Sequence, residues 1–204
     1  MNIEFRPATP EDCEQVVPLI YSSGPQTFDY VFAVDHPDQS LDFLRQAFIR
    51  DQGQFSYTEH TLILADGQIV GCGSLFNTDK SLAFMLESIK QIFSVYGIFK
   101  GAGVLIRGLK VERIIPPPKS GEAYICNLAA QPQGKGFGSR LMDYLIDAGK
   151  SQGLNTASLD VADSNPDAKA LYLHMGFSEI QHRPADSTYK WGKLVGHTYM
   201  TKPI

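Results

Sequence analysis

The sequence predicts an α/β (α+β) fold in which helices flank a mixed, mostly antiparallel sheet. Two observations indicate this fold. The runs 61–65 and 68–76 flank Asp66-Gly67, and an Asp-Gly pair between such runs is a strong signal for a tight antiparallel hairpin. Further along, the apolar run 123–130 is typical of a central strand and leads through a glycine-rich turn into a helix. The chain therefore combines a hairpin with strand-to-helix units.

The N-terminal part predicts one short strand and two helices. Residues 3–6 alternate as in a strand, and Thr9-Pro10 supplies an N-cap and a first-turn proline for a helix that ends near Tyr21. Ser22-Ser23-Gly24-Pro25 breaks this helix. Residues 38–40 then cap a second helix, whose apolar positions recur at helical spacing: Leu41, Leu44, Ala47 and Phe48.

The stretch 82–113 follows a helical period. One face collects apolar side chains, and Gly101 to Gly103 is expected to divide the stretch into two helices. The apolar face consists of Leu82, Met85, Leu86, Ile89, Phe93 and Tyr96. Pro116-Pro117-Pro118 then predicts an extended connector to the central strand.

The C-terminal part continues with alternating elements. A helix is expected over 136–151 and a strand over 156–161. Asn165-Pro166 caps a further helix that stops at Gly176, because asparagine is a preferred N-cap and glycine a preferred helix terminator. Two closing strands are expected over 177–182 and 197–202.

Composition excludes several classes of protein. The chain has 204 residues, of which 43% are hydrophobic and 20% charged, as in a globular protein. Its net charge of −4 offers no basic field, so we expect no nucleic-acid partner. The cysteines are odd in number and far apart, which predicts neither disulfides nor a metal site and favours the cytoplasm. The charged N-terminus lacks an export signal, and seven charges interrupt 82–115, so no membrane span is expected.

The loop from Gln131 to Arg140 is the main candidate for chemistry. It lies between a buried strand and a helix, where backbone N–H groups without internal partners can hold a phosphate. Glycines at 134, 136 and 138 leave the approach clear. The spacing fits neither a Walker P-loop nor a dinucleotide fingerprint. From the loop alone, an ordinary flexible turn remains an equal alternative, and Lys135 is either a phosphate partner or a solvated lysine.

Two motifs in order resemble the GNAT superfamily of N-acetyltransferases. Gln133-x-x-Gly136-x-Gly138 is similar to its pyrophosphate-binding signature, and Asn165-x-x-Ala168-x-x-Leu171-Tyr172-x-x-x-Gly176-Phe177 is similar to a later helix. The resemblance implies that acetyl-CoA is the cosubstrate and that no metal takes part. It assigns the pyrophosphate to Gln133, Gly134, Lys135, Gly136, Phe137, Gly138 and Ser139, and the pantetheine arm to Leu128, Ala129, Ala130 and Asn165. The backbone of the strand end 128–130 is also implied to polarise the thioester carbonyl.

Tyr172 matches the tyrosine that protonates the departing thiolate, and its pKa near 10 permits that transfer. A role in core packing is the alternative. Two carboxylates are candidates for the general base. Asp160 resembles the acid that lies twelve residues before the tyrosine in members that acetylate protein N-termini, and Glu122 begins the central strand. Both could instead be solvated strand-end carboxylates, and a chain of water molecules could serve without either.

The expected function is transfer of an acetyl group to a primary amine of a small molecule or peptide by direct attack. Alternatives are a different acyl donor or acceptor, and a non-catalytic module that binds or senses acyl-CoA. By the same resemblance, the chain is one domain over 1–204 with a helical insertion at about 80–118. The insertion is a lid over the acceptor, with Phe84, Phe93, Tyr96 and Phe99 as lining candidates, a core helix pair, or a homodimer interface.

Overall fold

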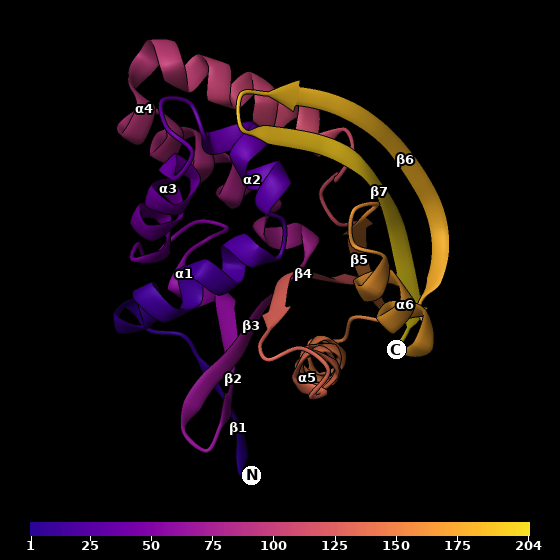
Figure 1. Cartoon of the computed structure of the whole chain (residues 1–204). Helices are drawn as coiled ribbons and strands as arrows, with labels where there is room; N and C mark the ends of the chain where they lie inside the picture. The colour runs from indigo at the N-terminus through magenta and orange to yellow at the C-terminus, as the bar shows by residue number, and fades with distance from the viewer.

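The computed structural model describes residues 1–204 and centres on one seven-stranded sheet (Figure 1). The strand order is β1-β2-β3-β4-β5-β7-β6, and all neighbours are antiparallel except the β4–β5 pair. The strands are β1 (Ile3–Pro7), β2 (His60–Ala65), β3 (Gln68–Phe76), β4 (Glu122–Ala130), β5 (Thr156–Ala162), β6 (Ser178–Tyr189) and β7 (Gly192–Pro203). The predicted mixed, mostly antiparallel sheet flanked by helices is confirmed.

Helices cover both faces of this sheet (Figure 1). They are α1 (Cys13–Ser22), α2 (Pro25–Phe32), α3 (Gln39–Phe48), α4 (Ser81–Glu112), α5 (Phe137–Ser151) and α6 (Pro166–His174). Alternate residues of β2 show the two layers, because Ile63 packs into the core beneath α5 whereas Leu62 and Leu64 pack beneath α1 and α3. Side chains of successive strand residues point to opposite faces, so the apolar run of β2 is buried on both sides.

Helix α2 begins at the predicted break and lies in a stretch for which the sequence predicted no element. Pro25 occupies the first turn, where its missing N–H costs nothing, and the helix then runs for eight residues. Its last residues Tyr30, Val31 and Phe32 are buried against β7 and α3. The break after α1 is therefore real, but it separates two helices.

The last two strands are longer than predicted. Each has twelve residues, against about six expected, and together they form a curved hairpin that arches over the molecule (Figure 1). Strand β6 is the sheet edge, so most of its side chains are exposed and give no apolar pattern. The hairpin tip contacts α2 so closely that a Cβ at Gly192 would overlap the backbone of Asp29 and Tyr30.

Helix α4 is bent in the middle. The sequence predicted two helices divided at Gly101 to Gly103, but the non-helical residue is Gly97, with φ 68° and ψ 179°. The bend brings Gly101 against Phe93, where an added Cβ would lie only 2.8 Å from the ring. Ile98 and Phe99 project at the corner and are 75% and 96% exposed.

Segment 78–112 is long and apolar enough, by length and composition alone, to cross a membrane. It also buries one side within the protein, at Gln91, Ile92, Tyr96, Gly101, Val104 and Arg107. Within the most apolar 18 residues of this segment, 28% are buried in the protein, and a single helix of this kind is weak evidence for a membrane span. Of the aromatic residues predicted to line a pocket, Tyr96 belongs to the core, Phe84 packs edge-on against Phe76, and Phe99 faces solvent.

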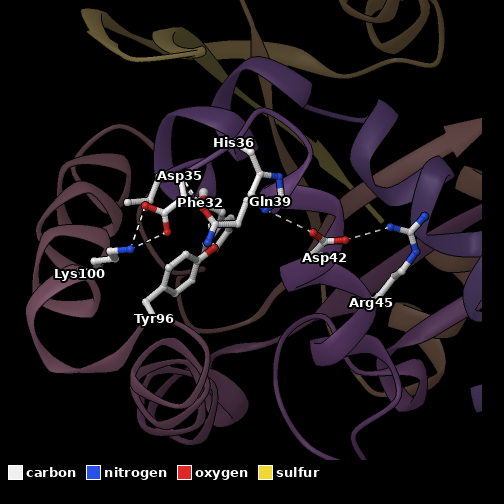
Figure 2. A network of polar contacts seen from close by, with 9 residues as sticks. Phe32, Asp35, His36, Gln39, Asp42, Arg45, Tyr96 and Lys100 are labelled. Carbon is white, nitrogen blue, oxygen red and sulfur yellow. Dashed lines mark hydrogen bonds and ion pairs between the residues drawn. The ribbon is translucent and has the colours of Figure 1, made fainter.

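Polar side chains tie α4 to the end of α2 and to the loop before α3 (Figure 2). Lys100 forms an ion pair with Asp35 at 2.8 Å, and the amide oxygen of Gln39 accepts the N–H groups of Val34 and Asp35. The hydroxyl of Tyr96 donates to the carbonyl of Phe32 at 2.7 Å.

Two further cationic side chains donate hydrogen bonds to carbonyl groups at and just after the end of α2, which have no partner within the helix. The guanidinium of Arg107 donates to the carbonyl of Val31 at 2.9 Å, and Lys190 of the hairpin tip donates to that of Val34. Hydrogen bonds from α4 and from the hairpin therefore hold the C-terminal end of α2 in place.

Candidate active site

The glycine-rich loop leaves the N-terminus of α5 open. Gly134 and Gly136 have φ of +75° and +76°, and a Cβ at either position would have no heavy atom within 4 Å. Gly136 is the N-cap of α5, and no side chain caps the helix. The first N–H groups of α5 are thus free to bind an anion, which the helix dipole also favours.

The other loop residues divide into solvent-facing and anchoring groups. Gln133 and Lys135 are exposed beside the open helix end, whereas Phe137 is buried in the core and fixes the first turn of α5. Gly138 and Ser139 are half-buried in that turn. The loop can therefore hold a phosphate group without rearrangement of the helix behind it.

Strands β4 and β5 pair only at their beginnings. Their parallel register joins Glu122, Ala123 and Tyr124 to residues 156–158, and beyond Tyr124 the edge of β4 that faces β5 has no strand partner. We call the opening between the two diverging strands the splay. Ala129 and Ala130 pair with β3 on their other side, which holds β4 in place. We call the unpaired edge of β4 the wall of the splay.

The three residues predicted to bind the pantetheine arm, Leu128, Ala129 and Ala130, lie half-buried on this wall and lead directly into the phosphate loop. Unpaired backbone groups on a strand edge can hydrogen-bond an extended amide chain. The wall and the loop together fit the amide-containing arm and the diphosphate of CoA.

Asn165 lies across the splay at the end of β5. Its side-chain oxygen accepts the N–H of Ala168 at 3.1 Å, which confirms the predicted N-cap of α6. The amide nitrogen of Asn165 is not used by the cap. A cavity of about 250 Å³ lies here, between the α1–α2 turn (residues 22–27) and residues Ala162, Ser164, Asn165 and Val195. It offers space beside the predicted cofactor contact.

Tyr172 lies on α6 and packs against the core beneath α5. Its ring is 6.1 Å from that of Phe177, and its hydroxyl makes no hydrogen bond to the protein. Burial raises the pKa of Tyr172 to about 12, so the phenol keeps its proton at neutral pH. The predicted packing role is therefore observed, and the hydroxyl has no protein partner that would compete for its proton.

Asp160 is buried on β5 and is not a solvated carboxylate. Its side chain is 2% exposed, accepts Nη1 of Arg183 at 2.8 Å, and accepts the hydroxyl of Tyr124 at 3.2 Å. Burial raises the pKa of Asp160 to about 6, and the charge of Arg183 opposes that rise. A carboxyl with this pKa can accept a proton near neutral pH.

Glu122 is also buried, on the same face of the sheet. Its carboxylate accepts the hydroxyls of Ser158 and Tyr199 and the backbone N–H of Lys119. These hydrogen bonds connect β4, β5 and β7 at this point. Of the two predicted carboxylates, Asp160 is the one coupled to Tyr124, the last paired residue before the splay.

Sequence reasoning missed the partners of these carboxylates. Arg183 lies one residue beyond the strand predicted over 177–182, and Tyr199 lies in the predicted strand 197–202 but gave no signal of its own. Their pairing depends on β7 lying between β5 and β6, an order that no local motif encodes. A buried acid in an otherwise apolar strand was the available sign that a cation lies opposite it.

The chain is similar to known acetyltransferases. The model of the acetyltransferase (GNAT) family matches residues 22–177, well over half of the chain. Among curated relatives, the mycothiol acetyltransferase of Beutenbergia cavernae is 31% identical over 80 residues, 39% of this chain and 26% of that protein. The [ribosomal protein bS18]-alanine N-acetyltransferase of Escherichia coli K12 is 42% identical over 64 residues, 30% of this chain and 43% of that protein. The chain therefore matches less than half the length of either relative.

Solved structures show the same fold over the whole chain. An N-acetyltransferase from Staphylococcus aureus Mu50 superposes with a TM-score of 0.66, covering 98% of this chain and 100% of that one at 18% identity. The splay, the open loop and the Asn-capped helix all lie within the residues that the family model matches. The chain belongs to the acetyltransferase (GNAT) family.

Proposed function

We propose that this protein transfers the acetyl group of acetyl-CoA to a primary amine of a small molecule or peptide. The observation that carries the proposal is the open N-terminus of α5, which follows directly on a strand, β4, whose edge toward β5 has no partner beyond Tyr124. Acetyl-CoA supplies the activated acetyl group. Gln133 to Ser139 would bind its diphosphate, and Leu128, Ala129, Ala130 and Asn165 its arm, with no metal ion required.

Two protons move in this reaction, and Tyr172 and the Tyr124–Asp160 pair are the groups that we propose donate and accept them. Tyr172 keeps its proton through neutral pH, so its hydroxyl can hydrogen-bond the sulfur that leaves. Its raised pKa makes it a weaker acid than a free tyrosine, so the proton would pass only as negative charge develops on that sulfur. On the other side of the splay, the hydroxyl of Tyr124 hydrogen-bonds Asp160. A proton from the attacking amine can pass to Tyr124 while Tyr124 passes its own to Asp160.

The acceptor would enter beside the α1–α2 turn, where the cavity of about 250 Å³ lies next to Asn165. Its volume suits a small amine or the end of a peptide, not a folded protein surface. We propose a cytoplasmic location, in keeping with three free cysteines.

The experiment is a thiol-release assay with purified protein, acetyl-CoA and a panel of amines, with the acetylated product identified by mass spectrometry. The panel contains aliphatic diamines, amino acids and a peptide with the N-terminal alanine of ribosomal protein bS18, because a relative is named for that acceptor. Binding of acetyl-CoA is measured in parallel by calorimetry. Turnover with any amine supports the proposal.

Absence of acetyl-CoA binding would refute both the site and the function. Binding without turnover on a broad panel would favour a sensing module instead. For the proton route, the rate should fall as the pH drops below about 6, because protonation of Asp160 removes the acceptor. Asp160→Asn should abolish that limb of the pH profile, and an unchanged profile would exclude Asp160 as the base.

A further inference from the structure

Strand β4 contains a bulge on the wall of the splay. Ser74 pairs with Cys126 and Cys72 pairs with Ala129, so Gly73 alone faces the two residues Asn127 and Leu128. Asn127 has φ +51°, in the left-handed region. Such a bulge changes the direction of the backbone, and asparagine is among the few non-glycine residues that adopt this conformation readily.

The position of Asn127 is unusual within this chain. Two other non-glycine residues have positive φ, and both lie in hairpin turns: Asp66 between β2 and β3, and Lys190 between β6 and β7. Turns commonly require that conformation, whereas the middle of a strand does not. The left-handed backbone of Asn127 must therefore be stabilised by contacts specific to β4.

The side chain of Asn127 reaches across β3 to His60 on β2. Its amide nitrogen lies 3.5 Å from Nε2 of His60, and Nδ1 of His60 lies 2.8 Å from the carbonyl of Ser56. A carbonyl only accepts, so Nδ1 carries the hydrogen and Nε2 is left as an acceptor for the Asn127 amide. Burial lowers the pKa of His60 to about 4, which keeps this arrangement at neutral pH.

His60 is itself held from behind. It is 2% exposed, its ring centroid lies 5.9 Å from that of Phe48, and it pairs with Ser74 in the sheet. Ser56, whose carbonyl accepts from His60, donates its own hydroxyl to the carbonyl of Arg50 at 2.6 Å. The imidazole ring of His60 is therefore held in one position, and it can position the side chain of Asn127.

We propose that Asn127 and His60 form a positioning pair that fixes the bulge of β4. The bulge lies past Tyr124, where the edge of β4 facing β5 has no partner, so its conformation decides where the N–H groups on that edge point. The family resemblance already implies that the backbone here donates to the carbonyl of a bound acyl thioester; the pair would set the direction of that N–H. The inference rests on the proposed function, because it assigns the splay to acetyl-CoA.

The test compares two ligands that differ only in that carbonyl, acetyl-CoA and S-ethyl-CoA, by calorimetry on the parent protein and two variants. Asn127→Gly permits the same φ and removes only the side-chain amide. Asn127→Ala also adds the cost of a left-handed alanine. Asp66→Ala is the matched control, since Asp66 has φ +50° but lies in a distant turn.

The parent should bind acetyl-CoA more tightly than S-ethyl-CoA by about fivefold, the worth of one hydrogen bond. Asn127→Gly and Asn127→Ala should bring this ratio close to one, with the affinity for S-ethyl-CoA unchanged within about twofold. Asp66→Ala should keep the parental ratio.

An unchanged ratio in Asn127→Gly would overturn the positioning role, because that variant keeps the backbone conformation accessible and removes only the contact with His60. Equal loss of affinity for both ligands would overturn it too, since that pattern indicates general damage to the site. A parent that binds neither ligand refutes the proposed function, and this inference with it.

Discussion

Substitution of Gly136 by alanine tests the phosphate loop against a control at the other end of the same helix. Gly136 begins α5 with φ +76°, and Gly153 follows its end with φ +78°; neither would place a Cβ within 4 Å of another atom. Both substitutions should therefore cost the same stability. A left-handed L-residue costs roughly 1–2 kcal/mol, partly offset by the lower entropy of the unfolded chain, which leaves about 1 kcal/mol.

For a chain of this size, that loss lowers the melting temperature by about 2–4 °C in both variants. Only Gly136→Ala should also weaken binding, because its methyl group enters the space in front of the free N–H groups of α5. Loss of one hydrogen bond to a charged phosphate is worth about 1.5–3 kcal/mol, or roughly a tenfold to hundredfold rise in Kd.

The assay is calorimetric titration of CoA into the two alanine variants and the parent, with melting curves recorded on the same samples. Equal melting temperatures and unequal affinities for CoA are expected. If Gly136→Ala and Gly153→Ala bind CoA equally well, the N-terminus of α5 does not hold the diphosphate, and the site assignment is wrong at its centre.

Three further predictions follow from single contacts. Tyr172→Phe should lower kcat at least about tenfold with Kd for acetyl-CoA unchanged within twofold, because the ring still packs; unchanged steady-state kinetics would remove Tyr172 from the chemistry. Asp12 has its pKa lowered to about 2, mainly by its hydrogen bond from Arg6, so its stabilisation is present above about pH 5 and lost as the pH falls toward 2. Asp12→Asn should thus lower the free energy of unfolding, measured in urea, by about 1–2 kcal/mol at pH 7 and by almost nothing at pH 2. The loss at pH 7 is smaller than the pKa shift alone implies, because Arg6 is partly exposed. An equal loss at both pH values would contradict this prediction. Gly192→Ala should cost about 1–3 kcal/mol, because its Cβ would overlap the backbone of Tyr30, and a parental melting temperature would show that the hairpin tip moves freely.

The sequence was sufficient where a feature depends on neighbouring residues. The Asp66-Gly67 hairpin, the glycine loop and the cap by Asn165 are all local, and each lies at the predicted residues. The loop could be placed because glycine is needed wherever backbone N–H groups must stay uncovered.

Features set by distant contacts were not predicted. The edge strand β6 lacks an apolar pattern, so its full length depends on pairing with β7. The bend of α4 lies at Gly97, whose φ of 68° is left-handed, whereas Gly101 packs against Phe93. The ion pair of Asp160 with Arg183 joins residues 23 apart in sequence across an intervening strand, and the positive φ of Asn127 depends on a histidine two strands away.

The end of α2 has a consequence for how the molecule opens. Three carbonyls there, those of Val31, Phe32 and Val34, accept hydrogen bonds from Arg107, Tyr96 and Lys190, and these donors come from α4 and the β6–β7 hairpin. Breaking α2 locally would leave the buried donors of Arg107 and Tyr96 without partners and would separate Gly192 from the backbone of Tyr30, so its amide protons should exchange with solvent only when α4 and the hairpin tip open as well. In hydrogen-exchange experiments, three segments far apart in sequence should therefore share one opening free energy, and the wall of the acceptor entrance would behave as a single cooperative unit.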